Sequence, residues 1–316
     1  MSKKLKLSLV IPCYNEAGNV RNFYDACEET FKDSDKDIEL IFVNDGSKDD
    51  TIKELNKLLT LKTKLSIKVV DFSRNFGKES AMFAGLNKTT GDYVCIIDAD
   101  MQQPPSLLPT MVKELDENEE YDVVAYFQEK RIEGKLVSKL KSMFYKTISK
   151  MSEVEFVDGA SDFRMMRRYV VDSILAMQEN NRFSKGIFAW IGFNTKYLPY
   201  TPNDRTYGTS SFNMVKLFKY ALSGIIAFSI VPLKLATYAG ILSSLISFIY
   251  LVVVILQKLI FGITVSGYAT IVVLILLLGG LNLLCLGIIG EYIARIYLET
   301  KKRPIFIERY TRTNEK

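Results

Sequence analysis

Two aspartates one residue apart, Asp98 and Asp100, directly follow the apolar segment Tyr93–Ile97. Two carboxylates at this spacing repel each other unless a cation or a proton lies between them. Their oxygens, together with the amide oxygen of Gln102, suit a hard cation such as Mg²⁺ or Mn²⁺, which usually also binds substrate phosphates. The pattern therefore predicts a metal site formed by Asp98, Asp100 and Gln102, although an isolated Asp-X-Asp is also common without a metal.

Three further polar segments follow apolar runs in the same part of the chain. They are Pro12–Glu16, Asn44–Ser47 and Ser73–Lys78. Such residues also form ordinary turns, so one segment alone indicates little. In a sheet of parallel strands, however, the carboxyl ends of the strands meet at one edge, and ligands bind there. Four polar segments in this position predict a binding site.

The segments reach one edge only if strands and helices alternate between them. We predict strands at Leu7–Pro12, Ile38–Val43, Ile67–Phe72, Tyr93–Ile97 and Asp122–Tyr126, and helices at Val20–Phe31, Thr51–Leu61, Gly77–Leu86 and Ser106–Leu115. This alternation predicts an α/β fold with a mostly parallel sheet covered by helices.

The composition excludes several kinds of chemistry. The chain has 316 residues, of which 48% are hydrophobic, 24% are charged and none is histidine. Nucleophile systems that need histidine, an imidazole base and histidine-containing zinc sites are therefore excluded. The four cysteines form no CxxC pair, which is typical of a reducing compartment. The net charge of +5 is too small to indicate a nucleic-acid partner.

Two uncharged apolar runs, Leu235–Gln257 and Ile263–Gly290, lie near the C-terminus. Each exceeds the roughly 20 residues that a membrane-spanning helix needs. A buried helix pair of a soluble protein is the alternative, but such helices rarely stay uncharged on all faces over this length. Lysines and arginines flank the two runs on their outer sides, whereas the connector carries only Lys258. The positive-inside rule then predicts that both termini are cytoplasmic.

Two amphipathic segments precede the apolar runs. Lys130–Lys150 is basic with interleaved apolar residues, and Phe212–Ile230 is apolar with two lysines. Both patterns predict helices at a membrane surface. The alternatives are a solvated helix face for the first segment and a helix packed on the sheet for the second.

The motifs, taken in order, resemble those of family 2 glycosyltransferases with the GT-A fold. The first matches are Ser8–Glu16, Val43–Thr51 and Asp98–Asp100, and further matches are Ser73–Lys78, Asp98–Pro105, Ser161–Arg164, Arg205 and Gly208–Ser210. With two C-terminal spans and the segment Gly290–Tyr297, the chain resembles the polyprenyl-phosphate glycosyltransferases. These include the bactoprenol glucosyltransferases and the relatives of dolichyl-phosphate mannose synthase.

The resemblance implies a role for each motif. Asp45 would recognise the nucleotide base. The other implied nucleotide-binding residues are Pro12, Tyr14, Glu16, Arg74, Lys78 and Asp98. Asp162 and Asp100 would be catalytic, and Arg131, Arg205 and Ser210 would contact the acceptor phosphate. The chain departs from the family pattern at Gln103, Gln128 and Ser211.

The resemblance also implies the reaction and its setting. We expect inverting transfer of one sugar, glucose from UDP-glucose as the first choice, to polyprenyl (undecaprenyl) phosphate, with Mg²⁺ or Mn²⁺ as the cofactor. A phosphate monoester has a second pKa of about 6 and is largely deprotonated at neutral pH. Asp162 could therefore orient a substrate instead of accepting a proton, and both roles stay open.

The expected organisation has four parts. Residues 1–210 form a cytoplasmic GT-A catalytic domain, 211–232 an interfacial amphipathic helix, 233–295 a two-helix transmembrane hairpin and 296–316 a basic cytoplasmic tail. The protein would lie in the inner (plasma) membrane, and the resemblance implies a homo-oligomer such as a tetramer.

Two alternatives remain at this stage. The first is a glycosyltransferase with another lipid or a polysaccharide as its acceptor; two spans disfavour a processive polysaccharide synthase. The second is a membrane-anchored scaffold that binds a nucleotide sugar without turnover. The presence of Asp98, Asp100 and Asp162 speaks against a scaffold.

Overall fold

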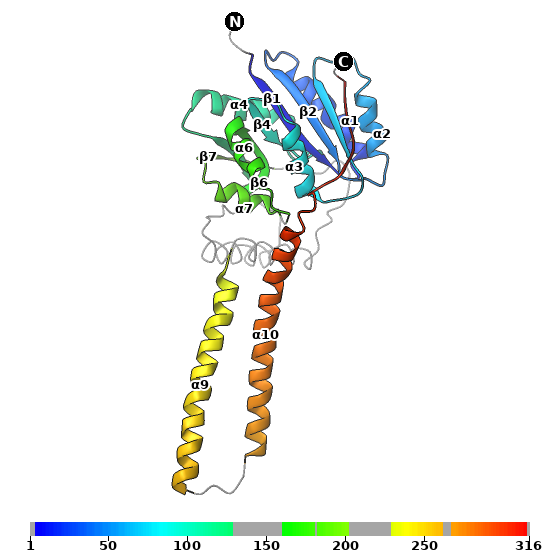
Figure 1. The fold of residues 1–316 in the computed structure, drawn as a ribbon. Coiled ribbons are helices and arrows are strands. Elements are labelled where there is room, and N and C mark those ends of the chain that lie inside the picture. The colour runs from blue at the N-terminus through cyan, green and yellow to red at the C-terminus, as the bar shows by residue number, and fades with distance from the viewer. Residues whose placement is uncertain (1–3, 129–159, 181, 202–228, 262–266, 315–316) are drawn as a thin grey trace.

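A computed structural model describes residues 4–128, 160–180, 182–201, 229–261 and 267–314. They form an α/β domain from which two long helices extend (Figure 1). Several predicted features lie outside the described residues, namely Arg131, Arg205, Ser210 and almost all of the two amphipathic segments.

The centre of the domain is an eight-stranded sheet in the order β7-β5-β6-β4-β1-β2-β3-β8. The strands are β1 (Lys6–Cys13), β2 (Asp37–Asn44), β3 (Ser66–Phe72), β4 (Tyr93–Ile96), β5 (Val123–Gln128), β6 (Ala160–Arg167), β7 (Thr195–Tyr200) and β8 (Glu308–Thr313). Strands β4, β1, β2 and β3 are parallel neighbours. Strand β6 pairs antiparallel with both β4 and β5, and β8 pairs antiparallel with β3.

Helices cover both faces of the sheet because its central strands are apolar on both sides. The helices are α1 (Ala17–Phe31), α2 (Thr51–Leu58), α3 (Lys78–Lys88), α4 (Leu108–Glu117) after the 3₁₀ turn Pro105–Leu107, α6 (Arg168–Ala176) and α7 (Ser184–Trp190). Leu9 of β1 belongs to the core under α1, α2 and α4. The next residue, Val10, belongs to the core under α3, α6 and α7, as the period of two in a strand requires. The layers are thus helix, sheet and helix.

The strands and helices predicted for residues 7–126 are confirmed, with ends that move by a few residues. The predicted helix Ser106–Leu115 begins with a 3₁₀ turn and continues to Glu117. Strands β6, β7 and β8 and helices α6 and α7 were not predicted. The three strands and α7 are short and rich in charged or aromatic residues, so they lack a clear period. Helix α6 does have apolar residues at helical spacing, since Val170, Val171 and Ile174 are buried along one face.

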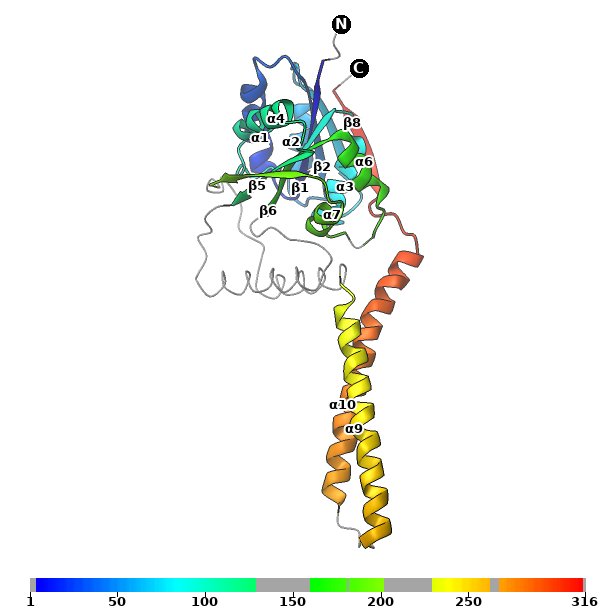
Figure 2. The ribbon, with the colours of Figure 1, turned by 90° about the vertical axis from the view of Figure 1, so that its left-hand side faces the viewer.

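The two long helices are α9 (Val231–Phe261) and α10 (Tyr268–Thr300). Both are long and apolar enough to cross a membrane, and neither apolar window is buried in the protein. Figure 2 shows them running side by side away from the domain. In Figure 1 the beginning of β1 lies on the far side of the domain from them, so the carboxyl ends of the parallel strands face the helices.

The last residues add an element to the predicted basic tail. Helix α10 continues to Thr300, and β8 then pairs with β3 and forms one edge of the sheet. Phe306 stacks on Phe72 with ring centroids 5.1 Å apart, and Asn314 accepts a hydrogen bond from the backbone N–H of Ile67 at 2.7 Å. The chain segment that leaves α10 is therefore fastened to the sheet.

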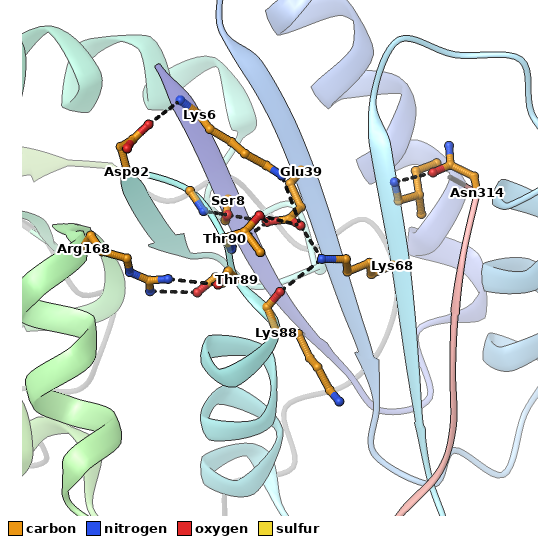
Figure 3. A network of polar contacts seen from close by, with 12 residues as sticks. Lys6, Ser8, Glu39, Lys68, Lys88, Thr89, Thr90, Asp92, Arg168 and Asn314 are labelled. Atoms are coloured by element: carbon orange, nitrogen blue, oxygen red, sulfur yellow. Dashed lines mark hydrogen bonds and ion pairs between the residues drawn. The ribbon is translucent and has the colours of Figure 1, made fainter. Parts of the chain in front are cut away.

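A buried polar network joins the strands at the end of the sheet opposite the polar segments (Figure 3). Glu39 of β2 is fully buried and accepts hydrogen bonds from Ser8 at 2.5 Å and Lys68 at 2.6 Å. Burial alone would raise the pKa of Glu39, but bonds from Lys68, Ser8 and Thr90 outweigh it and lower the pKa. The network ties β1, β2 and β3 together and leaves the other end of the sheet for the site.

Candidate active site

The polar segments predicted from the sequence lie where the parallel strands end. Asp45 follows β2, Arg74 follows β3, and Asp98 follows β4. Asp162 reaches the same edge by a different route. It is near the start of β6, and antiparallel pairing of Ile96 with Arg164 sets the start of β6 beside the end of β4.

Lys78 joins two of these aspartates. Its ammonium lies 2.8 Å from Asp98 Oδ1, 2.9 Å from Asp98 Oδ2 and 3.0 Å from Asp162 Oδ2. Lys78 is the first residue of α3, so the cluster combines a helix, the turn after β4 and strand β6. The structure thus brings together three of the predicted site residues.

The charges in this cluster depend on one another. Burial alone would raise the pKa of Asp162, but the Lys78 ammonium, with further cations at Lys185 and Arg164, lowers it to about 2. Burial would lower the pKa of Lys78, and the two carboxylates outweigh burial and raise it. Both groups are therefore ionised at neutral pH. A carboxylate with so low a pKa is a weak proton acceptor, which favours the orienting role of Asp162.

Asp45 fastens the loop that carries Arg74 and leads into Lys78. It is 3% exposed, and its carboxylate accepts bonds from the backbone N–H groups of Phe76 at 2.6 Å and Gly77 at 2.9 Å. The Asn75 amide donates a third bond at 2.9 Å. Burial raises the pKa of Asp45 although these backbone bonds oppose it. This loop-holding role is a finding; the predicted contact with a nucleotide base stays a prediction.

The loop after β1 interlocks with the loop after β2. The backbone N–H of Glu16 donates to Thr51 Oγ1 at 2.8 Å, and the backbone N–H of Asn15 donates to Ser47 Oγ at 3.0 Å. Tyr14, which precedes Asn15, is 42% exposed, and Pro12 lies within β1. The predicted residues Pro12, Tyr14 and Glu16 therefore share one edge with Asp45.

The turn Asp98–Gln102 carries the predicted metal ligands. Asp100 Oδ1 accepts a bond from the backbone N–H of Gln102 at 3.1 Å, which keeps the turn tight. The residues that the structure describes contain no group of three or more aspartate, glutamate, cysteine or histidine side chains that could hold a metal. Two carboxylates and an amide still suit Mg²⁺ or Mn²⁺, because such ions take their remaining ligands from substrate phosphates and water. Asp98, Asp100 and Gln102 therefore fit the predicted Mg²⁺ or Mn²⁺ when substrate phosphates and water complete the coordination.

Gln103 and Glu79 were not predicted as site residues; Gln103 was noted as a departure from the family pattern, and nothing in the local sequence marks Glu79. Gln103 is buried and donates to Ser161 Oγ at 2.9 Å, which joins the aspartate turn to β6. Glu79 follows Lys78 and accepts bonds from the backbone N–H of Ser184 at 3.0 Å and from its hydroxyl. Burial, and then the Asp162 carboxylate, raise the pKa of Glu79 to about 7.

With this geometry in place, comparisons with known proteins identify the family. Residues 8–175 match the family model for "Glycosyl transferase family 2". The chain belongs to glycosyltransferase family 2. Residues 231–296 match a second model, "GtrB C-terminal hairpin", which covers α9 and most of α10. The predicted family and the GT-A type of α/β fold are thereby confirmed.

Relatives in this family match along nearly their whole length. The bactoprenol glucosyl transferase of Shigella phage SfX is 40% identical over 96% of this chain and 98% of its own. A prophage bactoprenol glucosyl transferase homolog of Escherichia coli K12 is 39% identical over the same shares. Among solved structures, the glucosyl-3-phosphoglycerate synthase of Mycobacterium tuberculosis, in complex with Mn²⁺ and UDP-glucose, is 19% identical, with a TM-score of 0.45 over 70% of this chain and 77% of its own.

Proposed function

We propose that this family 2 glycosyltransferase transfers a single glucose from UDP-glucose to polyprenyl (undecaprenyl) phosphate at the cytoplasmic face of the plasma membrane. The product would supply a lipid-linked sugar for modification of cell-envelope glycans. The observation that carries the proposal is the Lys78 ammonium between Asp98 and Asp162, at the sheet edge that faces two apolar helices. The relatives named bactoprenol glucosyl transferase support the choice of sugar and acceptor.

Each residue of the cluster has a task in this reaction. An oxygen of the acceptor phosphate attacks the anomeric carbon, the bond from that carbon to the UDP oxygen breaks, and the configuration inverts. Lys78 offsets the negative charge that grows on the departing diphosphate. Asp162 orients the acceptor or the sugar, because a phosphate needs no base to become a nucleophile. Asp98, Asp100 and Gln102 would hold Mg²⁺ or Mn²⁺, which as a Lewis acid stabilises the leaving group.

The hairpin explains the position of the site. The isoprenoid tail of the acceptor stays in the bilayer, so its phosphate is accessible only at the membrane surface. Helices α9 and α10 would cross the membrane with both chain termini in the cytoplasm, and the apolar windows of both helices are exposed. We include a homo-oligomer, with a tetramer as one arrangement, in the proposal. Arg131, Arg205 and Ser210 keep their proposed roles at the acceptor phosphate.

The experiment is a donor screen with the purified full chain, polyprenyl phosphate and Mg²⁺ or Mn²⁺. We expect labelled glucose to enter the lipid extract from UDP-glucose, and mass spectrometry should identify polyprenyl-phosphate glucose. The Asp100→Ala variant is the control and should give at least about 100-fold less product. Sugar transfer to diacylglycerol or to a polysaccharide would show that the proposed acceptor is wrong. No product with any common nucleotide sugar would favour the scaffold.

A further inference from the structure

A cleft of about 520 Å³ lies between two segments that are far apart in the sequence. One wall is the loop after β3, with Arg74 and Phe76, and the other is the segment after α10, with Arg303, Ile305 and Ile307. The cluster of Lys78, Asp98 and Asp162 does not line it. This volume lies in the range of small-ligand sites.

Two arginines, Arg74 and Arg303, line the cleft, and its described lining includes no acidic side chain. Arg74 is attracted electrostatically by the Asp45 carboxylate, which is buried, does not line the cleft and accepts hydrogen bonds from the backbone N–H groups of Phe76 and Gly77. The Arg74 guanidinium lies 4.0 Å above the Phe76 ring, which holds it in place. The nearby acidic residue Glu299 is bonded to Asn180, through the backbone N–H at 2.9 Å and the side-chain amide at 3.1 Å. Planar guanidinium groups in such surroundings bind phosphate oxygens.

The position of the cleft indicates the source of the phosphate. Helix α10 ends at Thr300, and Arg303 belongs to the basic run Lys301–Arg303 that follows directly. Beyond it, Ile305 and the half-exposed Ile307 add apolar surface to the same wall. Basic and apolar residues at the end of a membrane helix match the chemistry of an anionic lipid, whose charged headgroup lies above its acyl chains.

We propose that this cleft binds the phosphate headgroup of an anionic phospholipid of the surrounding bilayer, with Arg303 as the residue specific to this site. The inference rests on the proposed membrane insertion of α9 and α10, and it needs no particular sugar or acceptor. Asp45 holds the loop that carries Arg74. A headgroup bound by both Arg74 and Arg303 would connect this loop to the end of α10. The lipid would thereby fix the donor side of the enzyme relative to the membrane surface.

The test measures thermal unfolding of the full chain in a neutral detergent. Dioctanoyl phosphatidylglycerol should raise the melting temperature by about 3 °C or more near saturation, and dioctanoyl phosphatidylcholine should not. The Arg303→Gln variant should lose most of this rise and still melt at the wild-type temperature without lipid. The matched control is Lys302→Gln, one residue away and outside the cleft lining, which should keep the rise. High salt should weaken the effect.

An equal rise in Arg303→Gln or an equal rise with phosphatidylcholine would overturn the proposal. A full rise with inorganic phosphate alone would also overturn it, because it would indicate a site for small anions. Short-chain polyprenyl phosphate forms a further arm. If only this lipid raised the melting temperature through Arg303, the cleft would belong to the acceptor and the phospholipid proposal would be wrong. Glucose transfer is assayed separately, so failure of the proposed function would be seen independently.

Discussion

Lys78 Nζ and Asp162 Oδ2 lie 3.0 Å apart, although one residue begins helix α3 and the other lies in strand β6. The same ammonium contacts both carboxylate oxygens of Asp98. Lys78 therefore partly offsets the charge of two aspartates of the candidate site before any substrate arrives. A divalent cation that binds to these aspartates with the donor must compete with Lys78 or release it toward the diphosphate.

Replacing Lys78 should separate its two effects. In Lys78→Met, the growing charge of the leaving group loses a compensating cation, and kcat/KM should fall by about 10²- to 10³-fold. In the absence of nucleotide sugar, the same variant should bind Mn²⁺ more tightly than the wild type, because its carboxylates have lost their counter-ion. Titration of Mn²⁺ monitored by electron paramagnetic resonance measures the second effect. Lys78→Arg is the charge-retaining control, and unchanged Mn²⁺ affinity in Lys78→Met would refute the counter-ion role.

Asp162 should affect the rate without shaping its pH dependence. Its pKa of about 2 means that it stays ionised from pH 5 to 9, the range of a practical assay. Asp162→Asn should lower kcat by roughly 10²-fold through loss of orientation, equally at every pH. A pH–rate profile of both proteins measures this. If the wild type had an acidic limb that Asp162→Asn lacked, Asp162 would be a proton acceptor.

Glu79 should make stability depend on pH near neutrality. Its folded-state pKa of about 7 lies above the ordinary value of 4.5, so ionisation of Glu79 favours the unfolded chain. The resulting cost is absent below pH 4.5, grows as the pH rises and is complete above about pH 7. Glu79→Gln cannot ionise and can still accept a bond from Ser184. Its gain in the free energy of unfolding should therefore grow from none at pH 4.5 to at most about 3 kcal/mol at pH 8.

The measurement is thermal unfolding of both proteins in detergent across this pH range. Ser184→Ala tests the local environment, because removal of the hydroxyl donor should raise the pKa of Glu79 further and shift the transition to higher pH. A gain in Glu79→Gln that is equal at all pH values would contradict the assignment.

The sequence predicted the central sheet because those strands have simple patterns. Leu7–Pro12 and Ile67–Phe72 are apolar runs bounded by polar turns, and their parallel order follows from the intervening helices. Asp45 and Asp98 were found for the same reason, since Asp45 directly follows β2 and Asp98 stands two residues after β4. At these positions the order of residues along the chain was sufficient to predict where the side chains lie.

Strand β6 could not be predicted, although it carries Asp162. Arg164 is only 4% exposed within it, and a charged residue in a short segment indicates a loop. The buried guanidinium is accommodated because it lies 3.6 Å above the Phe188 ring of α7 and donates to the Ser161 carbonyl oxygen at 3.1 Å. Phe188 is distant in sequence, so tertiary packing decides this element. The contact of Lys78 with Asp162 could not be predicted either, because it depends on the tertiary packing of β6.

Strand β8 should depend on Asn314. The Asn314 side chain accepts from Ile67 N–H at 2.7 Å and donates to the Leu65 carbonyl oxygen at 3.0 Å. Asn314→Ala leaves both backbone groups without these partners and should lower the free energy of unfolding by about 1–3 kcal/mol. Asn314→Asp keeps the acceptor and should lose less. Hydrogen exchange of β3 and β8 amides locates the effect, and protection equal to wild type in Asn314→Ala would show that β8 is held elsewhere.

Alanine substitutions at Gly46 and Gly77 test whether steric clash or backbone strain matters more for the loop Arg74–Gly77. Both have positive φ, +60° and +98°, so an alanine at either position costs about 1 kcal/mol or more in backbone strain. A Cβ at Gly46 would also lie 2.3 Å from the Arg74 carbonyl carbon and 2.5 Å from the Asn75 nitrogen, whereas a Cβ at Gly77 would meet nothing within 4 Å. Gly46→Ala must therefore push the Arg74–Gly77 loop away from Asp45.

We expect Gly46→Ala to lose at least about 2 kcal/mol more stability than Gly77→Ala. Because the displaced loop carries Arg74 and leads into Lys78, Gly46→Ala should also raise KM for the nucleotide sugar. Thermal unfolding and donor titration of the two variants measure both effects. Equal losses in the two variants would mean that the backbone relaxes around Gly46, so that the close approach of the β2 and β3 loops does not position the candidate site.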